Sequence, residues 1–387
     1  MLTVGDVVAA LEQRYRPSWA EPWDSVGLTC GDPASPVGRV LFAVDPAPAV
    51  VAEARECGAD LLVTHHPLLL AGVHSVAATT PKGRVVHDLV QHGVALFSAH
   101  TNADSADPGV SDALASALGL VDLRPLRPLA DALDKVVVFV PHADAQRVLD
   151  ALASAGAGRI GDYDRCGYVL AGTGTFRPRA GANPTIGTIG EIEQVAETRL
   201  EMVVPRDRRA AVVQALRAAH PYEEPAFDLF ELAAFDSRRG LGRIGHLPEP
   251  ETLEDLVGRV AAAVPATVAG VQAGGDPDRV VQAVAVCGGA GDSLLSAAER
   301  AGVDAFVTAD LRHHPASEAL DAGGPALVNV SHWASEWPWL AAASQALVAD
   351  LGAGGQAVEI RVSEVCTDPW TMHAESLSDE LLEADDA

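Results

Sequence analysis

Short apolar runs that end in histidines or acids constrain the fold of this chain more than any other feature. Three of these runs are followed by His65-His66, by His100 with Asp104, and by His332 with Glu336. Runs of this kind are typical of buried strands in parallel sheets. The carboxyl ends of such strands meet at one edge of an open sheet, so we expect these polar side chains to lie close together. Imidazoles and carboxylates gathered in this way favour a metal site.

Strand and helix patterns alternate in two parts of the chain. In the first part we expect strands at Val40–Val44, Asp60–Thr64 and Val94–Ser98, and helices at Ala47–Cys57, Gly83–His92 and Ser111–Leu118. In the last part we expect strands at Val280–Val286, Ala305–Thr308 and Ala326–Val330, a tight turn at Gly288–Gly291 with a helix ending at Ala301, and helices at Ala316–Asp321 and Ala334–Val348. The alternation predicts an α/β fold with parallel strands and right-handed helical crossovers.

The two parts resemble each other in sequence. Gly58–Thr64 aligns with Gly302–Thr308, and Gly93–Ser98 aligns with Gly324–Asn329. Each segment is a glycine turn, a buried strand and then a polar residue. We interpret the parts as two related α/β half-domains that together form one site.

A segment of different character separates the two halves. It reads as strand Lys135–Val140, helix Ala143–Ala155, strands Gly167–Thr175 and Leu200–Val204, helix Asp207–Ala219 and strand Ala226–Leu232. Thr173–Glu191, rich in Gly, Pro and Thr, is expected to be a long loop. The order predicts an inserted ferredoxin-like α+β domain. We therefore expect half-domains at 1–124 and 241–366, an insert at 125–240, and an acidic, disordered tail at 367–387.

Composition limits the classes of partner. Of 387 residues, 48% are hydrophobic and the formal net charge is −26. This predicts a globular chain, and the negative charge makes nucleic acid an unlikely partner. The five cysteines form no CxxC pair, which indicates reduced thiols and a cytoplasmic location. No secretory signal or bilayer-spanning run is visible, so we expect no membrane partner.

The spacing of the polar residues leaves alternatives open at each position. His332 and Glu336 lie four apart at the start of a predicted helix, so they share one face. The adjacent His65 and His66 would point to opposite faces of a regular strand, so both can be ligands only if the backbone leaves the strand there. The spacing of His332 and Glu336 is also common by chance, the adjacent histidines could be ordinary loop residues, and Asp104 could be an ordinary acid of a turn or helix N-terminus. It is the coincidence at strand ends that favours a metal site.

Other polar residues near these runs have less defined roles. His100 could be a general base, a partner of a ligand, or an alternative ligand. Asp310, His313 and His314 are weaker candidates, because Asp310 could simply cap the following helix. Trp23 and Asp24 are expected only to pack an N-terminal element near the site.

Five sequence blocks resemble the signature blocks of the Nif-three-like family, whose members are commonly called GTP cyclohydrolase I type 2 homologues. The blocks occur in the family's order, with small departures at Ser25, Ala103 and Ala309: Trp23–Leu28, Val63–Leu68, Ser98–Asp104, Asp310–His314 and Ser331–Glu336. The resemblance implies a dinuclear metal centre in which His66 and Asp104 serve one ion, His65 and His332 serve the other, and Glu336 bridges.

The same resemblance implies a toroidal homohexamer and, in longer members, an insert of PII/CutA type, which Ala219–Pro225 fits. Two divalent ions can hold a shared water or hydroxide and lower its pKa. The ligand types suit Zn, Fe, Mn, Co or Ni without choosing among them.

Three functions follow from such a centre. The first is a metal-dependent hydrolase, GTP cyclohydrolase I type 2-like, acting on a nucleotide or similar small heterocycle, with His100 as a candidate catalytic residue. The second is a non-enzymatic metal-binding or regulatory protein whose insert senses a small molecule. The third is a phosphoesterase with the same two-metal centre.

Overall fold

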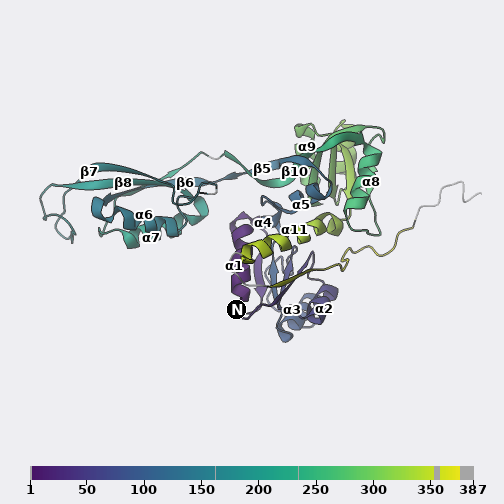
Figure 1. Cartoon of the computed structure of the whole chain (residues 1–387), viewed down its shortest axis with the longest axis horizontal. Helices are drawn as coiled ribbons and strands as arrows, with labels where there is room; N and C mark the ends of the chain where they lie inside the picture. The colour runs from purple at the N-terminus through teal and green to yellow at the C-terminus, as the bar shows by residue number, and fades with distance from the viewer. Residues whose placement is uncertain (1, 162, 234, 353–357, 375–387) are drawn as a thin grey trace, which may run out of the picture. The chain divides into compact units, whose positions relative to one another are not determined.

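The chain divides into two compact units (Figure 1). The computed structural model describes residues 2–161, 163–233, 235–352 and 358–374. One unit joins Met1–Leu129 to Arg238–Ala387, and the other is Ala130–Ser237. The sequence places the ends of the insert at residues 125 and 240. The two units are described separately below.

The first sheet of the larger unit has the strand order β1-β4-β3-β2-β15. These strands are β1 (Gly27–Cys30), β2 (Arg39–Ala43), β3 (Leu61–Thr64), β4 (Ala95–Ser98) and β15 (Glu359–Val362). Neighbours are parallel except β1, which runs antiparallel to β4. Helices α2 (Pro48–Cys57) and α3 (Pro81–Gln91) pack on one face, and α1 (Val4–Arg14) packs on the other.

The second sheet has the order β11-β14-β13-β12-β10-β5. Its strands are β5 (Val121–Asp131), β10 (Phe235–Thr252), β11 (Gln272–Gly274), β12 (Val280–Ala290), β13 (Ala305–Ala309) and β14 (Ala326–Val330). Strands β12, β13 and β14 are parallel. Helices α9 (Leu295–Ala301) and α10 (His313–Asp321) cover one face, whereas α5 (Val110–Ala117) and α8 (Leu253–Ala263) cover the other.

The two sheets repeat one local design. In each half a helix ends at a glycine in the left-handed region, Gly58 or Gly302, and a buried strand follows. A glycine adopts that backbone conformation without steric strain, so the chain reverses and enters the sheet at once. The α/β class predicted from the sequence is therefore confirmed.

Helix α11 (His332–Gly352) connects the halves (Figure 1). It leaves β14 of the second sheet and packs against α5 and β12 there, and against α1, β2 and β15 of the first half. Its buried Trp339 donates its indole N–H at 3.1 Å to the hydroxyl of Tyr15, the residue that follows α1. The first turn of α11 therefore lies where strands of both sheets end.

The smaller unit contains β6 (Leu133–Pro141), α6 (Ala145–Ser154), β7 (Gly167–Phe176), β8 (Glu193–Pro205), α7 (Arg209–Ala219) and β9 (Phe227–Glu231). Its sheet has the order β7-β8-β6-β9 with antiparallel pairs. Alternate β6 residues Val136, Val138 and Val140 are buried in a core with Val148 and Leu216 of the two helices. This is the β-α-β-β-α-β order that defines ferredoxin-like units.

Several expected boundaries are wrong. Strand β8 begins at Glu193 rather than at residue 200, because its first half pairs with the distal part of β7. Strand β12 continues to Ala290, where a tight turn was expected after residue 286. The tail was expected to be solvated from Thr367. Instead, the Thr367 hydroxyl donates a hydrogen bond to Asp45, and Asp368 accepts one from the Ser331 hydroxyl. Residues 375–387 of that tail lie outside the described residues.

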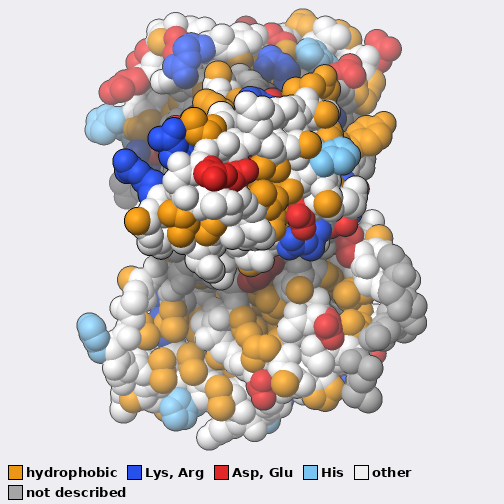
Figure 2. All heavy atoms as spheres, turned by 90° about the vertical axis from the view of Figure 1, so that its left-hand side faces the viewer, with side chains coloured by type: hydrophobic (Ala, Val, Ile, Leu, Met, Phe, Trp, Pro, Cys, Tyr) orange, Lys and Arg blue, Asp and Glu red, His pale blue; other side chains and the backbone are white. Residues whose placement is uncertain are grey.

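Among the described residues, the helices are all too short or too polar to cross a bilayer. On the face shown in Figure 2, cationic and acidic side chains are interspersed with apolar ones, and no broad basic patch is visible.

Candidate metal centre

The residues expected to be ligands converge inside the larger unit. His65 and His66 directly follow β3, and Asp104 ends the short helix α4 (Thr101–Asp104) after β4. His332 and Glu336 lie in the first turns of α11. Both adjacent histidines reach the cluster because the backbone leaves the strand after Thr64, whose hydroxyl donates to the His66 carbonyl at 2.8 Å.

Glu336 is the centre of the cluster. Its Oε1 lies 3.0 Å from His332 Nε2 and 3.4 Å from His65 Nε2, and its Oε2 lies 3.2 Å from His66 Nε2. His65 Nε2 is also 3.6 Å from Asp104 Oδ1, and the Nε2 atoms of His66 and His332 are 3.3 Å apart. The five expected ligands therefore present their ligand atoms to one small volume.

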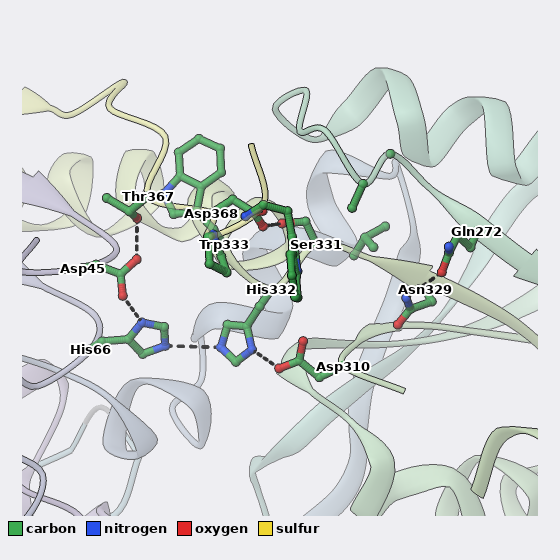
Figure 3. Close-up of a pocket in the computed structure, with 15 residues that line it drawn as sticks. Asp45, His66, Gln272, Asp310, Asn329, Ser331, His332, Trp333, Thr367 and Asp368 are labelled. Atoms are coloured by element: carbon green, nitrogen blue, oxygen red, sulfur yellow. Dashed lines mark hydrogen bonds and ion pairs between the residues drawn. The ribbon is translucent and has the colours of Figure 1, made fainter. Parts of the chain in front are cut away.

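The outward-facing nitrogens of the imidazoles are held by acceptors. The Nδ1 atoms donate from His66 to Asp45 at 2.7 Å, from His332 to Asp310 at 2.6 Å, from His100 to Asp24 at 2.8 Å, and from His65 to the Ala99 carbonyl at 2.9 Å. Figure 3 shows Asp45, His66, His332 and Asp310 in one line, with the two imidazoles facing each other. An acceptor at Nδ1 fixes the tautomer that leaves Nε2 free to bind a cation.

Asp310 holds its imidazole from an unusual backbone conformation. Its φ is +54°, in the left-handed region that residues other than glycine rarely adopt. The residue comes directly after β13, and the conformation turns its carboxylate toward His332. Such strain is typical of functional positions. The expected helix-capping role of Asp310 is wrong, since α10 begins at His313 with Arg312 before it.

Asp24 also has a role that was not expected from the sequence. Its side chain is fully buried, and it accepts from His100 Nδ1, from the Thr101 backbone at 3.0 Å and from the Thr101 hydroxyl. Burial opposes its ionisation, but the bonds from His100 and Thr101 outweigh burial and hold the pKa of Asp24 well below its usual range. Asp24 is therefore an anionic support for His100 and more than a packing residue.

Electrostatics show that the cluster attracts positive charge. Glu336 is only 3% exposed, yet the three histidines around it hold its pKa well below the usual value despite that burial. Burial opposes charge on the histidines, but Glu336 outweighs it and raises the pKa of His66 to about 11 and that of His332 to about 9. Burial raises the pKa of the Asp104 carboxyl. A buried carboxylate that stays ionised needs positive charge beside it, and a bound cation would supply that charge.

The donor set fits divalent cations. His65 Nε2 and Glu336 Oε2 are buried and, within the described residues, have no hydrogen-bond partner. Buried polar atoms without a partner are rare, and these two point into the cluster. Two groups, His65-His66-His100 and His66-His332-Glu336, each have ligand atoms within 4.8 Å of one another. Imidazole and carboxylate donors in this number suit Zn, Fe, Mn, Co or Ni.

The division of ligands between two ions stays a prediction. The sequence resemblance pairs His66 with Asp104 and His65 with His332. The contacts in the structure instead join His65 to Asp104, and His66 to His332. Glu336 contacts all three histidines, which is compatible with the expected bridging position.

Gly289 brings the backbone of the second sheet against the cluster. Its φ is +68°, and a Cβ built on it would lie 2.4 Å from Glu336 Oε1 and 3.3 Å from His332 Nε2. Its N–H donates to the Ser335 hydroxyl at 2.8 Å. Only glycine leaves room for the Glu336 carboxylate here, so the glycine pair near the end of β12 shapes the site.

The remaining weak candidates lie apart from the cluster. His313 and His314 begin α10, and their rings pack on each other with centroids 5.1 Å apart. Within the described part of the chain, neither belongs to a group that could hold a cation. Asp45 was missed, although it follows β2 just as the expected ligands follow their strands.

A pocket of about 430 Å³ opens beside the cluster (Figure 3). His66 and His332 form its floor, and Asn329 and Gln272 lie beyond Asp310. Residues Thr367–Trp370 also line the pocket. A concave pocket of this size next to convergent polar groups is the usual setting of a small-molecule site.

Comparison with known proteins gives one consistent family. Residues 2–369 match the family model described as Duf34/NIF3 (NGG1p interacting factor 3). A Mycobacterium tuberculosis protein named "GTP cyclohydrolase 1 type 2 homolog" is 53% identical over 379 residues, covering 97% of this chain and 99% of that protein. A Bacillus subtilis protein of the same name is 37% identical over 369 residues, covering 95% and 98%.

Solved structures agree with these sequence matches. The crystal structure of a Bacillus cereus protein related to NIF3 has a TM-score of 0.81 and 34% identity, covering 96% of this chain and 99% of that one. A Staphylococcus aureus protein, SA1388, has a TM-score of 0.75 and 28% identity over 96% of this chain. With the fold, the strand-end cluster and these matches in agreement, the chain belongs to the Duf34/NIF3 family.

Proposed function

We propose that this chain is a hydrolase that uses two divalent cations and acts on a nucleotide or similar small heterocycle. The observation that carries the proposal is the burial of Glu336 among three imidazoles, with His65 Nε2 and Glu336 Oε2 lacking partners in the described structure. Both atoms lie within ion-pair distance of their neighbours but make no hydrogen bond to a described residue, and a bound cation would satisfy both of them. The relatives named as GTP cyclohydrolase homologues support a nucleotide-related substrate.

His65, His66, Asp104, His332 and Glu336 would hold the cations. When bound, two such cations activate water and polarise the bond under attack. The carboxylates Asp45 and Asp310 hold the Nδ1 proton of His66 and His332, so that each Nε2 would offer its lone pair to a cation once the Nε2 proton has left.

His100 is the residue best placed to move a proton. Its Nδ1 donates to the anionic Asp24, which leaves Nε2 as the free nitrogen, and its ring lies 5.2 Å from that of His65 and 5.4 Å from that of His66. A carboxylate behind an imidazole orients the ring and stabilises the protonated form during proton transfer. We therefore assign His100 the general acid–base role and Asp24 the role of positioning it.

Elemental analysis and turnover test the proposal together. Protein purified without added metal should contain about two divalent cations per chain and, when loaded, should release product from a panel of nucleotides and related heterocycles. Glu336→Ala should lose both cations and turnover, because it removes the central ligand. Glu299→Ala, an exposed acid on α9, is the matched control and should behave like the wild type.

The outcomes separate the three functions inferred from the sequence. Bound cations with turnover of a C–N bond support the cyclohydrolase-type reaction, and turnover only of phosphate esters supports a phosphoesterase. Bound cations without turnover of any compound support a non-enzymatic metal-binding protein. Full turnover in Glu336→Ala would refute the proposed role of the cluster.

The family resemblance also leads us to propose a homohexamer. Light scattering on the full chain would give a mass six times that of the 40.1 kDa chain. A monomeric mass would reject this assembly without affecting the metal proposal, because the described ligands all come from one chain.

A further inference from the structure

Among the described residues that line the pocket beside the candidate metal centre, the imidazoles His66 and His332 are the only basic side chains. Fifteen described residues line it, and none is Lys or Arg. Three are acids, Asp45, Asp310 and Asp368. The Asp310 side chain is 55% exposed, so its negative charge faces the open part of the pocket. Like charges at short range repel, so these carboxylates oppose the binding of a phosphate group close to them.

The same pocket offers uncharged hydrogen-bonding groups. Asn329 on β14 and Gln272 on β11 are opposite each other in the antiparallel pair. Asn329 Oδ1 accepts from the Leu311 N–H at 3.1 Å, and its Nδ2 donates to Gln272 Oε1 at 3.3 Å. These bonds fix the amide orientations. They leave one Nδ2 hydrogen of Asn329 and the Nε2 group of Gln272 to donate to a ligand, because no bond from either occurs among the described residues.

An aromatic side chain borders the pocket on another side. The segment Thr367–Trp370 is held across the mouth, because Thr367 donates to Asp45 and Ser331 donates to Asp368. The backbone N–H of Trp370 donates to Asp368 Oδ1 at 3.1 Å, and the residue is 67% exposed. The exposed indole offers a flat apolar face on which a planar ligand can stack.

The amide of Asn329 and its partner Leu311 lie close in sequence to residues of the candidate metal centre. Asn329 precedes His332 by three residues at the junction of β14 and α11, and Leu311 follows Asp310, the acceptor of His332 Nδ1. Figure 3 shows Asn329 and Gln272 on the far side of Asp310 from the two imidazoles. A ring bound at the amides would therefore lie beside the reacting groups.

We propose that the Asn329–Gln272 end of this pocket binds an uncharged, planar heterocycle with acceptor atoms on one edge, of the nucleobase or nucleoside class, and disfavours its phosphorylated forms. The inference rests on the proposed function and narrows its substrate class. The two amides donate to the edge of the ring, Trp370 stacks on its face, and Asp310 and Asp368 repel phosphate. The established chemistry of base recognition uses these same amide and aromatic groups.

Calorimetry on the full chain with guanosine, GMP and GTP tests the proposal. After cations are removed with a chelator, guanosine should bind at least tenfold more tightly than GTP, because Asp310 and Asp368 repel the phosphates and no described Lys or Arg lines the pocket to offset that repulsion. Asn329→Ala and Gln272→Ala should each weaken guanosine binding about three- to tenfold, the value of a lost amide hydrogen bond. Gln282→Ala, an exposed glutamine on β12, is the matched control and should change nothing.

Trp370 variants separate stacking from folding. Trp370→Ala should weaken guanosine binding about tenfold, and Trp370→Phe, which keeps a flat ring, should restore most of it. Tighter binding of GTP than of guanosine to the chelated chain would overturn the proposal. So would failure of guanosine, adenosine, cytidine and uridine all to bind, or binding that is unchanged in Asn329→Ala and Trp370→Ala.

This experiment can fail independently of the proposed function. Binding to the chelated chain does not require the cations, whereas cation content and turnover do. Loss of cations in Glu336→Ala with guanosine binding preserved would separate the two sites. Turnover of GTP with no nucleoside binding would overturn this inference and leave the hydrolase intact.

Discussion

At the residue scale, the candidate site depends on histidines that are each held in place by a hydrogen-bond acceptor. Each histidine offers one ring nitrogen to the cluster and gives the other to an acceptor that fixes its orientation. The histidines stand out in the sequence because they follow apolar strands. Their supporting acids do not, because Asp24 is 76 residues from its partner His100 and Asp45 is 21 residues from His66. Only the fold brings them together.

The support from Asp45 can be measured through cation affinity. In Asp45→Asn the amide can no longer act as a carboxylate behind His66 Nδ1, so we expect the affinity for Zn²⁺ to fall about 10- to 100-fold. Competition with a chromophoric chelator gives that affinity directly. Asp278→Asn, at an exposed acid, should retain the wild-type affinity. Equal affinities in the two variants would show that Asp45 does not position His66.

Gly289 and Gly302 provide a matched pair of glycine substitutions. Both have φ of +68°, but only at Gly289 would a Cβ meet the Glu336 carboxylate, and nothing lies within 4 Å of a Cβ at Gly302. Gly302→Ala should therefore lower the unfolding free energy by about 1–2 kcal/mol through backbone strain alone. In Gly289→Ala the same backbone strain is joined by displacement of the Glu336 carboxylate. This variant should therefore also bind fewer cations than the wild type.

Urea unfolding and elemental analysis distinguish these two effects. If Gly289→Ala keeps its full cation content, Gly289 does not constrain Glu336, and the close approach of the backbone has no functional consequence.

At the element scale, the larger unit depends on how β10 is fixed to α5. Arg243 of β10 is 1% exposed and donates to Asp112 Oδ1 at 2.7 Å and to the carbonyls of Gly240 and Gly242 at 2.8 and 2.9 Å. It also donates to the Ala106 carbonyl. One buried guanidinium thus satisfies acceptors from both halves of the larger unit.

Removing that guanidinium should destabilise the larger unit strongly. Arg243→Ala leaves Asp112 as a buried charge without its partner, so we expect the unfolding free energy to fall by about 3–5 kcal/mol. All six tryptophans lie outside residues 130–237, so tryptophan fluorescence reports the unfolding of this unit alone. Arg300→Ala, on the surface of α9, should change stability by less than about 0.5 kcal/mol. Similar midpoints for both variants would contradict the assigned role.

In the smaller unit, an ion-pair network should make stability depend on pH. Asp134 accepts from Arg209 Nε at 2.6 Å and from Arg206 Nε at 3.2 Å. The bond from Arg209 holds the pKa of Asp134 below its ordinary value of 3.8, with Arg206 adding to the effect. A lowered folded-state pKa stabilises the fold above about pH 4, and this contribution is lost as the pH falls through the folded pKa.

Hydrogen exchange of the β6 and β8 amides measures this effect within residues 130–237. Protection in the wild type should fall as the pH drops below 4, whereas Asp134→Asn should be less protected at pH 7 and lack this part of the acid dependence. Asp228→Asn, an exposed acid on β9, should follow the wild-type curve. An acid dependence that is unchanged in Asp134→Asn would assign it to other groups.

At the scale of the whole molecule, the sequence predicts what is periodic or local and misses what is distant. The α/β class follows from alternating strands and helices, and the repeat follows from the aligned glycines Gly58 and Gly302. The edge strands β1 and β11, one in each sheet, were missed because they are short and lack an apolar run. The pocket could not be predicted, since Gln272, Asn329 and Trp370 carry no shared sequence signal and meet only after β11 pairs with β14.

The tail shows the same limit. Its acidic composition predicts a solvated end, yet Thr367 and Asp368 bond to Asp45 and Ser331 beside the candidate centre. These contacts span more than 35 residues of sequence, and composition does not encode them.

The central claim is that imidazoles and acids from distant segments hold two cations in one chain. Anomalous X-ray scattering from crystals of the full chain, purified without added metal and measured at the absorption edges of the candidate metals, tests it most directly. We predict two anomalous peaks next to Glu336, within bonding distance of His65, His66, Asp104 and His332. An empty cluster after Zn²⁺ or Mn²⁺ loading, or peaks only at other residues, would contradict the account.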